Sequence, residues 1–353
     1  MAISVSVPHI GPLQAGLRNS ITDVDGVRVG HCTLDAGPVQ TGVTVIAPHG
    51  GNLFTHRLPA AAAVINGFGK SAGLVQLEEL GLLETPIALS NTFAVGTLLN
   101  AQIAHTVRAN PQCGRSLPTV NALVLECNDG YLNDLQAMAV QAAHFEAAMQ
   151  ALSPEVAQGS VGAGRGMSSF GLKGGIGTAS RLAVVGQAAQ VFTVGALVLS
   201  NFGRLPELIL AGDPLGARLA AAEHCDSAPE KGSIIMILAT DAPLDARQLK
   251  RLATRAGAGL ARTGSVYGHG SGDIALAFST AQQIEVEAEC VQMALLADQV
   301  LDPLFHAAAD SVEQAIIHAL LTAETVRGRD GHVRVGLRER LADHPDLLGK
   351  TCI

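Results

Sequence analysis

Five short apolar runs do most to limit the fold of this chain. Each is rich in Val, Ile and Leu and is bounded by glycine or polar residues, as is typical of a buried β-strand. Residues 244–262 and 304–320 instead repeat apolar side chains at helical spacing. These patterns predict an α/β protein, and a doubly wound parallel sheet fits them as well as other layered folds. The predicted strands are residues 42–47, 122–126, 194–200, 232–239 and 274–279.

The aromatic content limits how the core can be filled. The 353 residues are 48% hydrophobic, yet they include nine Phe, two Tyr and no Trp, beside 39 Gly. The core is therefore predicted to consist of closely packed small aliphatic side chains. Charged residues make up only 15% of the chain, against about 25% in a typical soluble domain. This sparse charge favours a homo-oligomer that buries part of its surface.

Several classes of function are disfavoured by what the sequence lacks. The net charge is −8 and no basic cluster occurs, so nucleic acid is not an expected partner. We expect no membrane span or signal peptide, and hence a cytoplasmic protein. The scattered histidines show no metal-ligand spacing and the glycines match no nucleotide-binding motif, so neither a metal nor a cofactor is expected. The cysteines form no C-x-x-C pair and are predicted to be reduced thiols; they are Cys32, Cys113, Cys127, Cys225, Cys290 and Cys352.

The stretch SVYGHGSGDI, residues 265–274, holds the most unusual serine of the chain. A hydrolase elbow needs glycines two residues either side of its serine, but His269 and Asp273 stand there around Ser271. The apolar run that follows looks like a strand rather than the helix of an elbow. A phosphate-binding loop would need a lysine that is absent. An ordinary turn and a site of chain cleavage both remain open.

Cleavage between Gly270 and Ser271 would create a catalytic group. Ser271 would become the first residue of a new chain, with a free α-amine beside its hydroxyl. The pKa of such an amine is ordinarily about 7.7–8.0, so it can act as a base near neutral pH. Glycine before the bond leaves its carbonyl open to attack by the serine.

The chain around this bond resembles the DmpA/BapA family of self-processing aminopeptidases. Further motifs that look like those of the family follow in the same order over nearly the whole chain. They are GFGK at 67–70, ETP at 84–86, SNT at 90–92, ECNDG at 126–130, KGGIGT at 173–178, VGALV at 194–198 with Asn201, and ATDAP at 239–243.

The resemblance implies a fold, a maturation step and a nucleophile. The fold would be a single-domain four-layer α/β/β/α sandwich of the DmpA/ornithine-acetyltransferase type, akin to N-terminal-nucleophile hydrolases. Ser271 would cut the chain into residues 1–270 and 271–353 and then act as the catalytic serine. Family members work without a cofactor and are often tetramers of the processed pair, so we expect the same here.

The resemblance also implies a second serine and a glutamate, at Ser311 and Glu313. In the family such a pair lies near the start of a helix and polarises the nucleophile and its amine. The residues alone suggest another role, because Ser311 with Gln314 matches a capping box at a helix N-terminus. Similarly, Asp241 is predicted to cap the helix at 244–262.

Other candidate site residues lie at or just after the ends of the predicted strands. The resemblance implies that Asn201 binds the oxyanion, although a turn residue at a strand end would look the same. Glu126 is a candidate for binding a substrate ammonium and Tyr131 for lining the pocket, while NDG at 128–130 also indicates a turn. We interpret His269 as an exposed loop residue, and Cys127 as a small buried residue rather than a nucleophile.

The predicted activity is release of N-terminal amino acids from peptides, amides or esters through an acyl-enzyme on Ser271. Sequence does not separate L-, D- and β-amino-acid substrates. One alternative is acyl transfer of the ornithine-acetyltransferase kind, which uses threonine where this chain has Ser271. The other is an uncleaved ligand-binding protein without catalytic activity.

Overall fold

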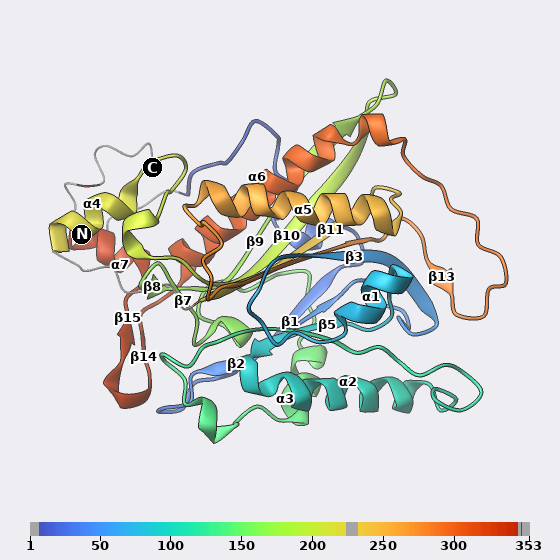
Figure 1. Cartoon of the computed structure of the whole chain (residues 1–353), viewed down its shortest axis with the longest axis horizontal. Helices are drawn as coiled ribbons and strands as arrows, with labels where there is room; N and C mark the ends of the chain where they lie inside the picture. The colour runs from blue at the N-terminus through green and yellow to red at the C-terminus, as the bar shows by residue number, and fades with distance from the viewer. Residues whose placement is uncertain (1–6, 224–231, 345–346, 348–353) are drawn as a thin grey trace.

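Two β-sheets pack face to face between two layers of helices (Figure 1). The computed structural model describes residues 7–223, 232–344 and 347. Cys225 and Cys352 lie outside them; Cys32, Cys113, Cys127 and Cys290 are free thiols. In the described part of the chain, no helix is long and apolar enough to cross a membrane.

The larger sheet contains seven strands. Within it β11 and β12 are parallel, whereas β9–β10, β10–β11 and β12–β3 are antiparallel. The doubly wound parallel sheet allowed by the sequence is therefore wrong. The strand order is β13 (Ile284–Glu285), β3 (His56–Gly67), β12 (Gly272–Ser279), β11 (Ser233–Thr240), β10 (Gln190–Asn201) and β9 (Gly175–Val185), with β4 (Leu82–Leu83) also paired to β3.

The smaller sheet lies against the inner face of the larger one. Its order is β1 (Arg28–Leu34), β2 (Thr41–Ala47), β5 (Ile87–Asn91) and β6 (Leu123–Cys127). Two short hairpins stand apart from both sheets: β7 (Ser168–Ser169) with β8 (Leu172–Lys173), and β14 (Val326–Arg327) with β15 (Val333–Arg334).

Helices cover the outer face of each sheet. The larger sheet carries α5 (Ala246–Arg262) and α6 (Asp302–Thr322), and the smaller sheet carries α2 (Val95–Ala109) and α3 (Ala142–Gln150). Three apolar cores result, one between the sheets and one under each helical layer, and Ala, Val, Ile and Leu dominate them as predicted. The remaining helices are α1 (Leu74–Leu80), α4 (Leu215–Glu223) and α7 (Leu337–Ala342).

The sequence located the buried strands but misplaced a helix cap. The five predicted strands correspond to β2, β6, β10, β11 and β12. Helix α5 begins at Ala246, and its capping box is formed by Asp245 and Gln248. The predicted cap Asp241 instead accepts a hydrogen bond from the backbone of Thr193.

Close approach between α6 and the sheet depends on a glycine. A Cβ placed on Gly177 of β9 would lie 1.9 Å from the backbone oxygen of Ala315 in α6. No side chain fits such a gap, so glycine is what lets the long helix pack directly on the strand.

Candidate active site

The sheet register brings two predicted site residues to the same end of the central strands of the larger sheet. Asn201, the last residue of β10, pairs with Ser233 at the start of β11. Ser233 pairs in turn with Gly272, the first residue of β12, and its hydroxyl accepts a hydrogen bond from Gly272 N at 3.0 Å. Ser271 directly precedes Gly272 of this paired set, so it lies at the same end of the sheet as Asn201.

Ser271 is completely buried in the intact chain and its polar atoms are held in place. Its Oγ donates to Asp273 Oδ1 at 2.6 Å, and its backbone N–H donates to the Gly268 oxygen at 2.9 Å. The Asn66 amide donates to the backbone oxygens of both Gly268 and Ser271. The bond between Gly270 and Ser271 therefore lies within a loop fixed on both sides.

A β-bulge shapes the strand that follows. Asp273 pairs with Asn66 but Ile274 pairs with Val64, which leaves Ile65 as the extra residue of β3. Bulges locally increase strand twist and re-aim side chains beside active sites. Here the bulge lies two residues after the serine.

Glu126, which belongs to the smaller sheet, lies near the same end of β12. It lies near the end of β6, is 3% exposed, and accepts hydrogen bonds from Lys70 N at 2.7 Å and Thr92 Oγ1 at 2.5 Å. A Cβ built on Gly69 would be 3.6 Å from Glu126 Oε1 and 4.0 Å from Gly272 Cα. The carboxylate and the start of β12 thus face each other across Gly69.

Asn201 is oriented by two backbone contacts. Its Oδ1 accepts from Ser168 N at 2.8 Å, and its Nδ2 donates to the Asn128 oxygen at 3.0 Å. An amide nitrogen carries two hydrogens. The Asn128 contact uses one, so the fixed side chain has a second to donate.

Tyr131 is connected to this asparagine through one arginine. The ring is 38% exposed, stacks on His332 with 4.6 Å between centroids, and has the Arg334 guanidinium 3.5 Å from its centre. Arg334 Nε also donates to Ser168 Oγ at 3.2 Å. Tyr131 therefore presents an exposed aromatic surface beside the Asn201 end of the site.

Burial changes the ionisation of groups behind Asn201. It raises the pKa of the Asp129 carboxyl to about 7 and holds the pKa of the Lys173 ammonium well below its ordinary value. Lys173 Nζ donates to the backbone oxygens of Gly164 and Gly174, each at 2.8 Å. The glycine-rich segment at 159–177 is thus held by a buried lysine.

Ser311 and Glu313 are not brought to Ser271. Ser311 is the tenth residue of α6, so its predicted place at the helix N-terminus is wrong, as is the capping box with Gln314. Its Oγ donates to the Val194 oxygen at 3.1 Å. Val194 lies seven residues before Asn201 on β10, which is roughly 23 Å along a strand.

Glu313 faces an arginine. Both Glu313 and Asp310 interact with Arg262, with N–O distances of 3.4 and 2.7 Å. Burial raises the pKa of the Glu313 carboxyl, and Arg262 partly opposes this effect. We refer to Arg262, Asp310, Ser311 and Glu313 as the α6 cluster.

The remaining two candidates lie where the sequence predicted. His269 is exposed, with its ring 6.1 Å from that of Phe68. Cys127 is completely buried and its thiol donates to the Leu199 oxygen at 3.6 Å. Desolvation raises the pKa of this thiol well above its ordinary value, which disfavours the reactive thiolate.

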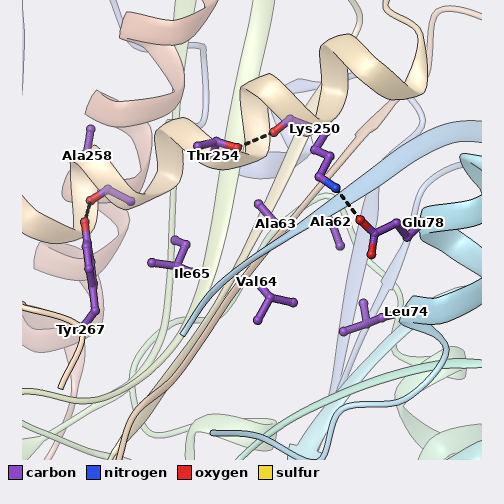
Figure 2. A pocket seen from close by; sticks show the side chains of 11 residues that line it. Ala62, Ala63, Val64, Ile65, Leu74, Glu78, Lys250, Thr254, Ala258 and Tyr267 are labelled. Carbon is purple, nitrogen blue, oxygen red and sulfur yellow. Dashed lines mark hydrogen bonds and ion pairs between the residues drawn. The ribbon is translucent and has the colours of Figure 1, made fainter. Parts of the chain in front are cut away.

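A pocket of about 550 Å³ lies between β3, α1 and α5 (Figure 2). It is bounded by residues 62–65 of β3, by Glu78 and Lys250, which form an ion pair, and by Tyr267. Ser271, Asn201 and Glu126 do not line it. Tyr267 binds the Gly257 oxygen of α5 at 2.5 Å and so anchors the loop that leads to the serine.

Sequence reasoning missed Asp273 and Asn66 as members of the site. Asp273 was recognisable, because residues i and i+2 of a strand face the same side and the run after Ser271 was already predicted to be a strand. Asn66 had no comparable signal, since it reaches Ser271 through the pairing of β3 with β12, over 205 positions of sequence.

Comparison with known proteins places the chain in a family. The model of peptidase family S58 matches residues 19–334. The β-peptidyl aminopeptidase BapA of Sphingosinicella microcystinivorans is 39% identical over 94% of this chain and 88% of its own. A β-aminopeptidase structure from Burkholderia sp. has a TM-score of 0.88 and 40% identity, covering 97% of this chain and 98% of its own.

A third relative identifies the fold. The L-aminopeptidase D-Ala-esterase/amidase of Ochrobactrum anthropi has a TM-score of 0.87 at 34% identity, covering 98% of this chain and 97% of its own. Its structure is described as a variant of the Ntn hydrolase fold. The predicted four-layer sandwich of the DmpA type is confirmed.

Proposed function

We propose, since the chain belongs to peptidase family S58 and is an aminopeptidase, that it matures by cutting its own Gly270–Ser271 bond. The observation that carries the proposal is the place of Ser271. It is the residue before the central strand β12, and its hydroxyl is already oriented by Asp273. Asn201 from the larger sheet and Glu126 from the smaller sheet lie near the same end of that strand. The products are an α chain of residues 1–270 and a β chain of residues 271–353.

After cleavage Ser271 supplies both nucleophile and base. Its new α-amine takes the hydroxyl proton, and Oγ attacks the carbonyl carbon of the first substrate residue. The amide of Asn201 donates its second hydrogen to the oxyanion. The leaving amine departs with a proton, and water then hydrolyses the ester to release the amino acid.

Selection of a free amino terminus is assigned to Glu126. A buried carboxylate already fixed by Lys70 N and Thr92 has its charge available to a substrate ammonium. Tyr131, exposed beside Asn201, would contact the side chain of the same residue. Ser311 and Glu313 support the helical layer instead, because their contacts lie elsewhere.

The substrate class is a peptide, amide or ester with a free amine. Two of the relatives described above are called β-peptidyl or β-aminopeptidases, which favours β-amino-acid substrates. A serine at position 271 and aminopeptidase relatives disfavour acetyl transfer to an amino acid. The tetramer of processed pairs and the cytoplasmic location stay predictions; light scattering of the purified protein checks the first.

Denaturing electrophoresis and an anilide panel test the proposal. Purified protein is expected to give two bands, and the smaller must begin Ser-Gly-Asp-Ile. Ser271→Ala is expected to give one band of 36.2 kDa and no turnover. Release of p-nitroaniline from β-, L- and D-amino-acid anilides ranks the substrates. A wild-type chain that stays whole, with no activity on the panel, contradicts the proposed maturation.

A further inference from the structure

Self-cleavage requires a base before the α-amine exists. In the intact chain the nitrogen of Ser271 is part of a peptide bond, whose resonance delocalises the nitrogen lone pair, so it cannot serve as a base; its N–H donates to the Gly268 oxygen. The base used for substrate turnover is therefore created by the first reaction and cannot drive it. A different group must remove the hydroxyl proton of Ser271 in the precursor.

We propose that Asp273 is the base of the precursor, so that the protein uses one base to mature and another to turn over substrate. This inference rests on the proposed self-cleavage. Asp273 Oδ1 accepts the hydrogen bond of Ser271 Oγ at 2.6 Å, and both residues are completely buried. Proton transfer needs this contact first, since a general base must lie within hydrogen-bond reach of its proton.

The other ionisable groups considered for the site contact groups other than the Ser271 hydroxyl. Glu126 accepts from Lys70 N and Thr92 Oγ1. His269 is exposed, beside the Phe68 ring. Glu313 binds Arg262 in the α6 cluster. Asp273 is the carboxylate that contacts the reacting hydroxyl.

The neighbouring backbone holds the scissile bond in a fixed geometry. Asn66 binds the backbone oxygens on both sides of the loop tip, at Gly268 and Ser271. Tyr267 has a positive φ of 57°, a strained value for a tyrosine, and its hydroxyl is anchored to α5. Strain of this kind persists when surrounding contacts enforce it, and here it lies three residues before the bond to be cut.

The chemical step balances without a further reactant. The Asp273 carboxylate takes the hydroxyl proton while Oγ bonds to the Gly270 carbonyl carbon. The tetrahedral intermediate collapses as the carbon–nitrogen bond breaks, and Asp273 returns the proton to the departing nitrogen. This gives an ester and the free amine of Ser271, and water then hydrolyses the ester to the Gly270 carboxylate and the Ser271 hydroxyl.

Asp273→Asn tests the inference on freshly translated full-length chain followed by electrophoresis. Loss of a general base is expected to slow cleavage by about 100-fold or more. Asp241→Asn is the matched control. Asp241 accepts from Thr193 N at 2.7 Å, beside the opposite end of β10, so this variant is expected to cut at the wild-type rate.

A cysteine background separates chemistry from folding. A thiol ionises more readily than a hydroxyl and needs less help from a base. The penalty of Asp273→Asn is therefore expected to shrink to about tenfold or less when it is measured in Ser271→Cys. An equal penalty in both backgrounds, or wild-type cleavage by Asp273→Asn, would overturn the assignment.

The failure of this inference can be told from that of self-cleavage itself. Ser271→Ala cuts only if Ser271 is not the group that cleaves the chain, which removes the proposed function. An uncut Ser271→Ala beside a normally cutting Asp273→Asn removes the role of Asp273 alone. Equal thermal unfolding midpoints of the two uncut variants show that Asp273→Asn has folded.

Discussion

Two of the predicted site serines, Ser271 and Ser311, are each followed two residues later by an acid, but the two pairs are placed very differently. Ser271 and Asp273 stand at the start of a strand, where residues i and i+2 face the same side, and their side chains are hydrogen-bonded at 2.6 Å. Ser311 and Glu313 stand within a helix, where two residues turn the side chain through about 200°. Their contacts diverge accordingly, to the Val194 oxygen and to Arg262.

The comparison shows that two side chains separated by two residues can be expected to interact only when the secondary structure is known, because they face the same side of a strand but not of a helix. Both pairs are buried and both acids are ionisable, so composition and burial do not separate them. In the strand pair, the Ser271 hydroxyl donates a hydrogen bond to the Asp273 carboxylate. The helix pair connects α6 to β10 on one side and to α5 on the other.

Removing the proposed oxyanion donor, Asn201, which lies at the same end of the sheet as the strand pair, is expected to have the largest effect. Asn201→Ala should lower kcat by about 10²–10³, because the second amide hydrogen is lost. Asn201→Asp keeps the acceptor for Ser168 N and loses the donor, so a similar loss is expected. Steady-state kinetics of the cut enzyme measure both; near-normal kcat in Asn201→Asp contradicts the assignment.

Neutralising Glu126 should have the next largest effect. Glu126→Gln keeps an acceptor for Lys70 N but removes the charge, and a charge-assisted hydrogen bond contributes about 1.5–3 kcal/mol. KM for substrates with a free amine should therefore rise about ten- to a hundredfold, with kcat less affected. A substrate whose amine is blocked is the control, and the variant should not weaken its use further.

The helix pair should affect stability and leave cleavage unchanged. Ser311→Ala removes one hydrogen bond and should lower the free energy of unfolding by about 1 kcal/mol. Ser279→Ala is a comparison variant, since its buried hydroxyl also donates to a backbone oxygen, that of Ala242, and in addition accepts from Ala281 N. Urea denaturation in the uncut Ser271→Ala background measures both, and cleavage is scored with Ser271 present. A Ser311→Ala chain that fails to cut would remove the distinction between the pairs.

The smallest effect is a pH slope from Glu313. Burial raises the pKa of this carboxyl in the folded state, so the folded protein holds its proton to a higher pH than the unfolded chain does. Its contribution to stability therefore falls as pH rises above the ordinary glutamate value of 4.5. Glu313→Gln should flatten the urea midpoint measured from pH 4 to 7, and an unchanged slope would contradict this.

Much of the fold followed from local pattern. Short apolar runs marked five strands, because burial on both faces demands uninterrupted Val, Ile and Leu. The arrangement of those strands did not follow, since apolar runs do not record whether neighbours are parallel or which sheet they join. That part came from the resemblance to a family.

The sequence indicated the part of the candidate site that depends on a single residue and the bond before it. It did not indicate the parts that depend on how strands pair. Ser271 was singled out as a candidate from its glycine neighbours and the bond before it. Ser311 was misplaced because its local sequence also reads as a cap, whereas α6 begins at Asp302, nine residues earlier. Asn66 is near Ser271 only through the register of β3 against β12.

The central place of β12 gives the proposed cleavage a consequence for refolding. This strand lies between β11 and β3, and α6 packs across β9 and β10. Both β12 and α6, which belong to the 271–353 segment, are therefore interleaved with the rest of the chain. A single chain reaches this arrangement at a rate independent of protein concentration. The cut pieces, once unfolded, must find each other again, so their recovery should slow on dilution. Under the proposed maturation, the chain therefore has a unimolecular route to the native state only while the Gly270–Ser271 bond is intact.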